Sequence, residues 1–259
     1  MALVTLTTDF GNASPYAAAM KGALLSINPA ATIVDLSHLL PPQDVRFAAY
    51  FLAESMPYFP SGTIHIAVVD PGVGTDRQLL LVQAGEQFQL APDNGILSFA
   101  LAELGAPTIR KLTESRFWRS NPSTTFHGRD ILAPVAAHLA LGTPPAEFGP
   151  VVTNWNRLVE PSPTVNGAMT LGEVVYIDSF GNLITNIRRQ HLPRSPGLVS
   201  IGQRTEIPLV RTYGDAQPGS IVALVGSSGR LEISRVNGSA AQFLGINVEA
   251  VVGIGSRLL

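Results

Sequence analysis

The sequence predicts an α/β fold in two domains: an N-terminal α/β domain with a largely parallel sheet at residues 1–165, and a smaller all-β domain at 166–259. From Leu3 to about Leu141, short β-branched runs alternate with helical periodicity, as in βαβ units. Residues 142–167 hold five prolines and three glycines without periodicity, which is typical of a linker. Beyond this segment, short strands separated by Gly, Asn, Asp and Ser turns predict a small β-barrel or sandwich.

The first two strands and the helix between them follow from local signals. Leu3–Thr7 is the first expected strand, and Thr32–Leu36 is the second. Ser14 is expected to cap the helix, with Pro15 at its first position. The residues expected on the buried face of this helix are Tyr16, Met20, Ala23, Leu24 and Ile27.

The remaining elements are predicted by the same criteria. Asp44 is expected to cap a helix at Val45–Met56, and Thr63–Val69 to form a buried strand that ends before proline, which cannot continue a ladder. The other elements expected in the first domain are a hairpin of Leu79–Val82 and Phe88–Leu90, a short helix at Gly95–Leu104 and a longer helix at Ile131–Leu141. The strands expected in the second domain are Glu173–Ile177, Leu183–Ile187, Thr205–Leu209, Ile221–Leu224 and Leu231–Arg235.

The composition excludes several classes of protein. Lys and Arg number 17 and Asp and Glu 19, giving a net charge of −2, so no overall field favours nucleic acid or an anionic membrane. Hydrophobic residues make up 46% of the chain, which excludes intrinsic disorder. No apolar run reaches the ~18 residues of a membrane span, and the first residues lack the pattern of an export signal. We therefore expect a soluble, cytoplasmic protein.

The standard metal and nucleotide motifs are missing from the sequence. Cysteine is absent, which excludes disulfides, cysteine-based zinc sites and thiol nucleophiles. The five histidines are scattered, without the HxH or HExxH spacing that places two imidazoles on one metal, so no metal is expected. The glycine-rich segment 72–77 has Arg77 where the third glycine of a dinucleotide fingerprint belongs, and 226–230 lacks the lysine of a P-loop.

Polar residues at the ends of the expected strands are candidates for chemistry, because open parallel sheets bind ligands beyond the carboxyl ends of their strands. Asp9 follows the first strand and either accepts hydrogen bonds from a ribose diol or forms the turn into the helix. Asp70 ends the third strand, where it is either functional or a turn former. Arg77 and His127 carry weaker signals individually, and Asp130 is expected as a helix N-cap.

Five motifs occur in one order along the chain. They are Thr7-Thr8-Asp9-Phe10-Gly11, Val69-Asp70-Pro71-Gly72-Val73-Gly74-Thr75 with Arg77, Ala91-Pro92-Asp93-Asn94-Gly95, Phe126-His127-Gly128-Arg129-Asp130 and Asp178-Ser179-Phe180-Gly181-Asn182. The last sets an aromatic ring beside an amide able to read a base edge, although a strand-to-turn connection explains its glycine and asparagine equally well. With these motifs the chain resembles, from about Leu3 to Leu259, the S-adenosyl-L-methionine (SAM) hydroxide adenosyltransferases, also called SAM hydrolases, which are related to the SAM halogenases.

The resemblance implies an activity, an assembly and a set of catalytic residues. The activity is hydrolysis of SAM to adenosine and methionine without a metal cofactor. The implied fold has a β-barrel as the second domain, and the implied assembly is a homotrimer with sites between neighbouring subunits. By the same resemblance Asp70, Arg77 and His127 hold and activate the attacking water, and Asp9 binds the ribose.

The resemblance also implies residues that bind the rest of the substrate. Phe180 stacks on the adenine and Asn182 reads its edge, Asp178 contacts the methionine amino group, and Ser227 contacts the methionine carboxylate. Halogenases carry an arginine where this chain has Ser228.

Two departures favour a hydrolase over a halogenase. A tryptophan that lines the halogenase pocket is replaced by Gln43, and the tight turn Ala84–Gln87 stands where fluorinases carry a long insertion. A SAM halogenase and a non-catalytic SAM- or adenosine-binding protein are the alternative functions. The presence of all three candidate catalytic residues argues against a protein that only binds.

Overall fold

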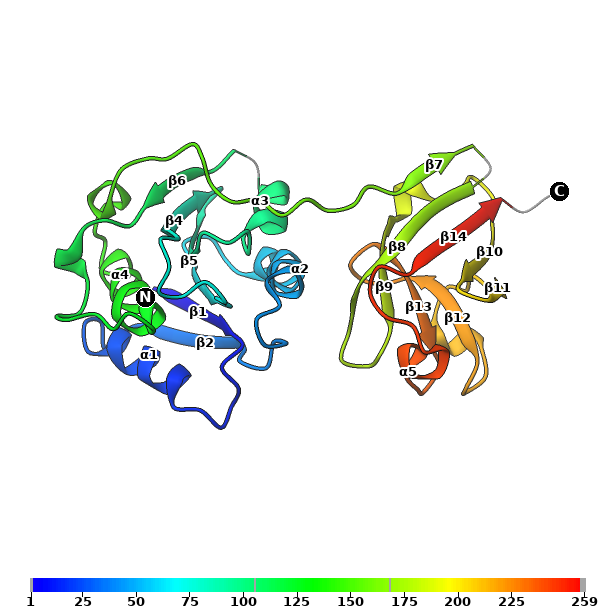
Figure 1. Ribbon diagram of the computed structural model, residues 1–259, viewed down its shortest axis with the longest axis horizontal. Helices are drawn as coiled ribbons and strands as arrows, with labels where there is room; N and C mark the ends of the chain where they lie inside the picture. Colours follow the sequence, from blue (N-terminus) through cyan, green and yellow to red (C-terminus); the bar gives the residue numbers. More distant parts are fainter. Residues whose placement is uncertain (1, 105, 168, 257–259) are drawn as a thin grey trace. The chain divides into compact units, whose positions relative to one another are not determined.

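The computed structural model describes residues 2–104, 106–167 and 169–256. Its internal contacts divide the chain into two compact units, Met1–Val159 and Glu160–Leu259. The first unit combines a sheet with helices, and the second is built mainly of strands (Figure 1). None of the helices among the described residues has the length and apolar content that a membrane-spanning segment needs.

The sheet of the first unit is mixed, with strands in the order β2-β1-β3-β5-β4-β6. Its strands are β1 (Leu3–Thr8), β2 (Thr32–Ser37), β3 (Ile64–Val68), β4 (Leu79–Ala84), β5 (Gln87–Pro92) and β6 (Thr108–Lys111). The β2, β1, β3 and β5 strands pair in parallel, whereas β4 is antiparallel to both of its neighbours. This confirms the predicted hairpin of β4 and β5, and it makes the sheet mixed where the sequence predicts a largely parallel one.

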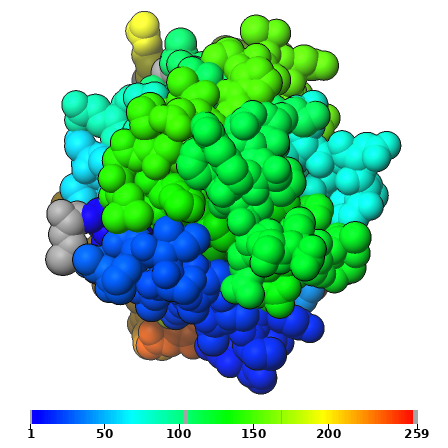
Figure 2. Space-filling model, turned by 90° about the vertical axis from the view of Figure 1, so that its left-hand side faces the viewer, coloured from blue at the N-terminus to red at the C-terminus, as the bar shows by residue number. Residues whose placement is uncertain are grey.

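Helices cover both faces of this sheet. They are α1 (Tyr16–Leu25), α2 (Val45–Ser55), α3 (Ser98–Leu104) and α4 (Ala133–Ala140). The α1 and α4 helices pack side by side against one face (Figures 1 and 2). The α2 and α3 helices cover the other face (Figure 1). Fully buried Leu6, Leu24 and Leu52 belong to these two cores; each such side chain contributes about 1.5–3 kcal/mol of burial free energy.

Two details of α1 differ from the prediction. The helix begins at Tyr16 with Pro15 at its N-cap, and no side chain caps it, so the predicted Ser14 cap is wrong. Tyr16 is 48% exposed, whereas Met20, Ala23 and Leu24 are buried as predicted. The Tyr16 ring instead joins an aromatic cluster with two phenylalanines that lie beyond the helix.

Other predictions for the first unit are confirmed or extended. Asp44 caps α2 by accepting a hydrogen bond from the Phe47 N–H at 2.8 Å, as predicted. The helix expected at Ile131–Leu141 is α4 preceded by a π-helical turn at Gly128–Leu132. Short 3₁₀ turns lie at Met56–Tyr58, Ser115–Phe117 and Pro145–Phe148.

The second unit is an antiparallel sheet that nearly closes into a barrel. Its strands are β7 (Thr164–Asn166), β8 (Met169–Ile177), β9 (Leu183–Arg188), β10 (Pro196–Ile201), β11 (Arg204–Ile207), β12 (Ile221–Val225), β13 (Arg230–Arg235) and β14 (Val251–Ser256). They follow the order β11-β10-β14-β8-β9-β13-β12, with β7 beside β8. Leu209, just after β11, forms a bridge with Ala223 of β12, which brings the two ends of this order together.

A short helix and two turns complete the second unit. The helix α5 (Ala240–Leu244) is capped by Ser239, whose side chain accepts a hydrogen bond from the Gln242 N–H. The 3₁₀ turns are Arg189–His191 and Tyr213–Asp215. All five strands predicted here are present, and the barrel-like sheet agrees with the barrel that the family resemblance implies.

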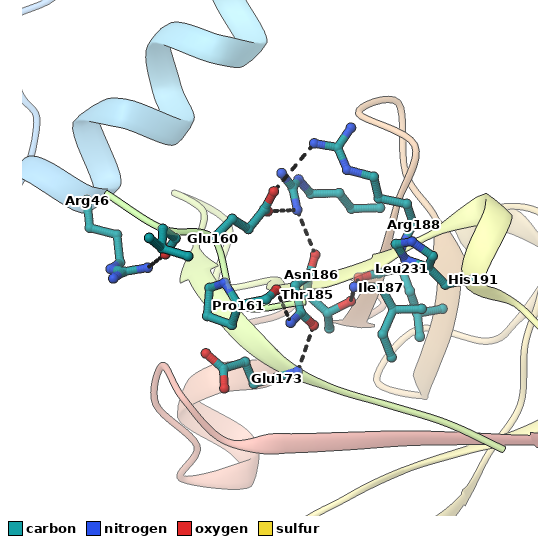
Figure 3. A network of polar contacts seen from close by, with 12 residues as sticks. Arg46, Glu160, Pro161, Glu173, Thr185, Asn186, Ile187, Arg188, His191 and Leu231 are labelled. Carbon is teal, nitrogen blue, oxygen red and sulfur yellow. Dashed lines mark hydrogen bonds and ion pairs between the residues drawn. The ribbon is translucent and has the colours of Figure 1, made fainter. Parts of the chain in front are cut away.

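The first residues of the second unit are anchored to its sheet by a polar network (Figure 3). The Glu160 carboxylate pairs with Arg230 at 2.6 Å and with Arg188 at 3.7 Å. The Asn186 side chain donates a hydrogen bond to the Pro161 carbonyl at 2.8 Å. Because Arg188 and Arg230 are cross-strand neighbours on β9 and β13, the Glu160 carboxylate lies against two like charges.

Candidate active site

The first unit contains a cavity of about 470 Å³ at the carboxyl ends of β1 and β3. This is the edge at which a parallel sheet is expected to bind ligands. Residues that line the cavity are Asp9, Phe10, Tyr16, Gln43, Val68, Asp70, Val73, Ser123, Thr125, Phe126, His127, Gly128 and Arg129. Three of the residues singled out from the sequence, Asp9, Asp70 and His127, therefore face one space.

Arg77 joins two of these residues in one hydrogen-bonded group. Its Nε lies 2.7 Å from both carboxylate oxygens of Asp70, and its Nη2 also donates to this carboxylate. The same Nη2 lies 3.1 Å from Nδ1 of His127. Both partners of the ion pair have side chains only 7% exposed, so water screens it weakly. The structure thus assembles the three residues predicted to be catalytic.

The contact with Arg77 determines the protonation of His127. A guanidinium has only donors, so Nδ1 of His127 must accept, and the proton of the neutral ring must lie on Nε2. Burial lowers the pKa of His127 below 6.5, and the positive charge of Arg77 lowers it further against the opposing effect of Asp70. At neutral pH the ring is therefore a hydrogen-bond donor through Nε2.

Close packing explains the glycine that follows His127. A Cβ atom on Gly128 would lie 3.1 Å from the Met20 sulfur of α1 and 3.3 Å from a Val68 methyl of β3. A side chain there would push these neighbours away by a few tenths of an ångström, so glycine suits the close approach of the π-helical turn to the sheet and to α1. The backbone contact fixes the position of the neighbouring imidazole.

The turn after β1 holds Asp9 at the cavity. Oδ2 of Asp9 accepts a hydrogen bond from the Gln43 N–H at 2.8 Å. The turn itself is tied to the chain after β2 by the Gly11 N–H, which donates to the His38 carbonyl at 2.7 Å. Asp9 lines the same cavity as Asp70, and its carboxylate is an acceptor to which a diol is able to donate.

An aromatic wall completes one side of the cavity. The rings of Phe10, Tyr16 and Phe126 meet edge to face with centroids 5.4–5.8 Å apart. The Arg129 guanidinium lies 4.8 Å above the Phe126 ring. Such a wall suits an apolar or cationic part of a ligand, because aromatic faces attract positive charge.

Asp130 does not cap a helix, contrary to the prediction. It lies within the π-helical turn, 1% exposed, and its carboxylate accepts two hydrogen bonds from Arg129 and one from the Ser123 N–H. Burial alone would raise the pKa of Asp130, but these hydrogen bonds outweigh it and lower the pKa. Asp130 therefore orients Arg129 at the cavity.

The second unit has a cavity of its own, also of about 470 Å³. It is lined by Phe180, Asn182, Tyr213, Arg235, Asn237, Gly238 and Ser239. Phe180 is 77% exposed, whereas Asn182 is 7% exposed. A large exposed aromatic ring beside a buried amide fits a flat heterocycle, which needs both a stacking surface and a hydrogen-bond partner.

Asp178 shapes the turn that carries these two residues. Its Oδ1 accepts hydrogen bonds from the N–H groups of Phe180 and Asn182, and its Oδ2 accepts one from the Asn182 side chain, all at 2.9 Å. Ser227 is exposed in the turn between β12 and β13. Neither Asp178 nor Ser227 is among the described residues that line this cavity.

Sequence reasoning missed several residues of both cavities. Tyr213 and Arg235 belong to the second cavity. Burial raises the pKa of Tyr213 to about 12, and hydrogen bonding to Glu232 adds to the effect. No local sequence pattern marks these residues, because turns that lie far apart in the sequence bring them together.

Within the described residues, no three His, Asp or Glu side chains are grouped closely enough to hold a metal ion.

Comparison with family models covers most of the chain. The model described as the SAM hydroxide adenosyltransferase N-terminal domain matches residues 4–149. The model of the C-terminal domain of the same family matches residues 172–253.

Comparison with individual proteins gives the same result. Proteins named (R)-S-adenosyl-L-methionine hydrolase from Thermus thermophilus and Salinispora tropica are 41% and 39% identical to this chain; the matches cover 94% of this chain and 95% and 94% of the relatives. A fluorinase from an Actinoplanes species is more distant, at 30% identity over 90% of each chain. The crystal structure of an uncharacterized conserved protein from Thermotoga maritima superposes with a TM-score of 0.90 at 33% identity, over 98% of this chain and 100% of that chain.

Proposed function

The chain belongs to the SAM hydroxide adenosyltransferase family, and from this premise we propose that it is an enzyme that hydrolyses SAM to adenosine and L-methionine. The observation that carries the proposal is the buried group in which Arg77 binds both Asp70 and His127 beside the cavity. Asp70 and His127 are oriented by a common partner, as in-line attack by a held water requires.

Hydrolysis of SAM requires the protein mainly to orient the attacking water. The water oxygen forms a bond to C5′ of the ribose while the bond from C5′ to sulfur breaks. The electron pair of the C5′–sulfur bond stays on sulfur, and methionine leaves as a neutral thioether. The sulfonium is already an activated leaving group, so neither a general acid nor a metal is needed. Orientation contributes about 7–11 kcal/mol to such a step, against about 3–5 kcal/mol for a general base.

Within the catalytic group, the roles of Asp70 and His127 differ. His127 carries its proton on Nε2 and donates, so it orients the water through a lone pair of the water oxygen. Asp70 is the acceptor of the group and takes the proton that the water loses. Arg77 stabilises the negative charge of Asp70 and fixes the ring of His127.

The remaining substrate contacts are divided between the two units. Asp9 binds the ribose diol, Phe180 stacks on the adenine and Asn182 reads its edge. Asp178 and Ser227 contact the amino and carboxylate groups of methionine. The assembly is a homotrimer with each site formed between neighbouring subunits, and the protein acts in the cytoplasm, where a chain without cysteine is at no disadvantage.

One reaction tests the activity. Purified protein is incubated with SAM, first without halide and then in excess chloride or fluoride, and the nucleoside is identified by chromatography. We expect adenosine in every case, because the Asp70 carboxylate offers water a hydrogen-bond acceptor and a place for its proton, whereas it offers a halide no donor. A 5′-halogenated nucleoside as main product identifies a halogenase, and ligand binding without turnover identifies a binding protein; both refute the proposal.

A further inference from the structure

The turn Ala91–Gly95 is the one sequence motif to which the cavities assign no role. It leads from β5 toward α3. Within it, Nδ2 of Asn94 donates a hydrogen bond to the Val69 carbonyl at 2.9 Å. Val69 directly precedes Asp70, so this bond holds the backbone from which the Asp70 side chain extends.

The same turn holds the other end of the loop between Asp70 and Arg77. The N–H of Asp93 donates to the Gln78 carbonyl at 2.9 Å, and Gln78 directly follows Arg77. The neighbouring residues Asp93 and Asn94 therefore fix both ends of the loop whose first and last residues form the buried ion pair. The turn that contains Asp93 and Asn94 thus fixes the backbone next to both Asp70 and Arg77, which lie seven residues apart.

The sheet explains why a side chain is needed here. The β3 and β5 strands are parallel, in a register in which the Phe88 N–H donates to the Thr63 carbonyl at 3.0 Å. Continued along β5, this register reaches Pro92, which has no N–H, and then Asn94, whose N–H turns back to the Pro92 carbonyl. The Asn94 side chain supplies Val69 with the donor that the backbone does not.

The orientation of Asn94 is fixed from two sides. Its Oδ1 accepts a hydrogen bond from the Ile96 N–H at 3.2 Å, so the amide cannot rotate without losing both bonds. Gly95 has a φ of +93°, and a Cβ there would lie 2.8 Å from the Leu158 side chain. The positive φ and the contact with Leu158 therefore favour glycine beside Asn94.

We infer that Asn94 is a positioning residue for catalysis, which places the Asp70 carboxylate against Arg77 and His127 by holding the Val69 carbonyl. The inference rests on the proposed function, because it assigns Asn94 to the same reaction. Asn94 acts through the backbone and does not contact the reacting atoms. Its loss should lower turnover and leave substrate affinity almost unchanged.

Two alanine variants separate this role from plain stability. Asn94→Ala removes the bond to Val69, and the matched control Asn156→Ala removes a bond of the same kind, from Nδ2 of Asn156 to the Asp93 carbonyl at 2.8 Å. We expect kcat to fall roughly tenfold or more in Asn94→Ala alone, with KM for SAM near the wild-type value in both variants.

A spectroscopic readout makes the test independent of turnover. In ¹⁵N-labelled protein, the His127 Nδ1 resonance reports the contact with Arg77, so Asn94→Ala should shift this resonance and its titration, and Asn156→Ala should not. If Asn94→Ala does not fold, Asn94→Asp replaces it, since this variant keeps an acceptor for Ile96 but presents an acceptor to Val69. A folded Asn94 variant with wild-type kcat or an unchanged His127 resonance overturns the inference. A wild-type enzyme that forms no adenosine refutes the proposed function instead, and the resonance comparison still decides the role of Asn94.

Discussion

Arg77 gives Asp70 and His127 different tasks, because a guanidinium donates to both and accepts from neither. Replacing Asp70 with asparagine keeps its shape but removes the proton acceptor. We expect kcat to fall by roughly 10²–10⁴-fold in Asp70→Asn, and by at least about tenfold in His127→Ala, while adenosine still binds. Steady-state kinetics and adenosine calorimetry measure the two effects. Wild-type turnover in both variants would remove these residues from the mechanism.

Asp9 provides the opposite case at the same cavity. Asp9→Ala removes the carboxylate proposed to accept from the ribose, and each charge-assisted hydrogen bond of this kind is worth roughly 1.5–3 kcal/mol. We expect the dissociation constant for adenosine to rise at least about tenfold in this variant. An unchanged adenosine affinity would show that Asp9 does not hold the ribose.

The lowered pKa of His127 predicts how turnover depends on pH. Protonation places a hydrogen on Nδ1, which then opposes the Arg77 donor instead of accepting from it. Because burial holds this pKa below 6.5, kcat should stay level as pH falls to about 6.5 and decline only at more acid values. The pH profile of kcat measures this decline at acid pH. In a His127→Asn variant with residual activity, the decline should disappear. If the variant shows the same decline, another group causes it.

The candidate catalytic residues were predictable only through the order of their motifs. Asp70 and Arg77 lie seven residues apart, but His127 lies 50 residues beyond Arg77, and no local pattern joins them. Tyr16 fits the helical period of the buried face, but it is 48% exposed because it is the first residue of α1 and packs in the aromatic cluster at the cavity. The resemblance to a family supplied the combination that periodicity could not.

At the scale of elements, a buried histidine ties two strands together. Nδ1 of His65 in β3 lies 2.7 Å from the Thr5 hydroxyl in β1, and the residue is 1% exposed. Burial lowers the pKa of His65 from 6.5 to about 4. Between pH 6.5 and 4 the unfolded chain therefore binds a proton at His65 that the folded chain does not bind. As a result, the free energy of unfolding keeps the whole contribution of His65 above pH 6.5 and decreases as the pH drops toward 4.

The loss should amount to about 3 kcal/mol between these pH values. His65→Asn removes the titrating group, and we expect its unfolding free energy to depend less steeply on pH in this range. Urea unfolding at a series of pH values measures the slope. Above pH 7 the ring is neutral in both states, so the unfolding free energies of the wild type and His65→Asn should change with pH in the same way there. Equal slopes at acid pH would show that His65 is not the source.

The Glu160 carboxylate should stabilise the sheet of the second unit. Glu160→Gln removes the carboxylate charge that both Arg188 and the 4%-exposed Arg230 contact on β9 and β13. Since Glu160 is 27% exposed, its loss should cost roughly 1–3 kcal/mol, between the values for exposed and buried pairs. Thermal and urea unfolding measure the change. Glu173→Gln makes the same chemical change on β8 as a control, and equal stability of the two variants would contradict the prediction.

The sequence predicts those strands whose residues alternate between apolar and polar or are continuously apolar. It does not reveal strands that are defined only by their pairing with other strands. β14 contains Val251-Val252-Gly253-Ile254-Gly255, in which the glycines obscure the alternation. Its partners are β8 and β10, one of them about 80 residues earlier in the chain. β6 has only four residues and extends the first sheet beyond β4. Such strands depend on long-range neighbours, which a local pattern does not reveal.

At the scale of the whole molecule, the proposed substrate contacts are split along the chain. Asp9 and Asp70 belong to Met1–Val159, whereas Phe180 and Asn182 belong to Glu160–Leu259. Each unit has its own cavity, and neither cavity contains both sets. Under the proposed function, a complete site combines one unit of each kind. In the proposed trimer, a closed cyclic assembly, neighbouring subunits supply the two units of every site.

Mixed oligomers test this arrangement directly. Asp70→Asn disables the first unit and Asn182→Ala disables the second, so neither protein alone should be active. If every site pairs the first unit of one subunit with the second unit of the next, random mixing of equal amounts makes about a quarter of the sites intact, since each half is undamaged half of the time. Co-expression followed by purification and an adenosine assay should recover about that fraction of wild-type turnover. If both halves come from one chain, every site carries one defect and no activity returns; that result, or a fully active monomer in sedimentation, rejects the shared site.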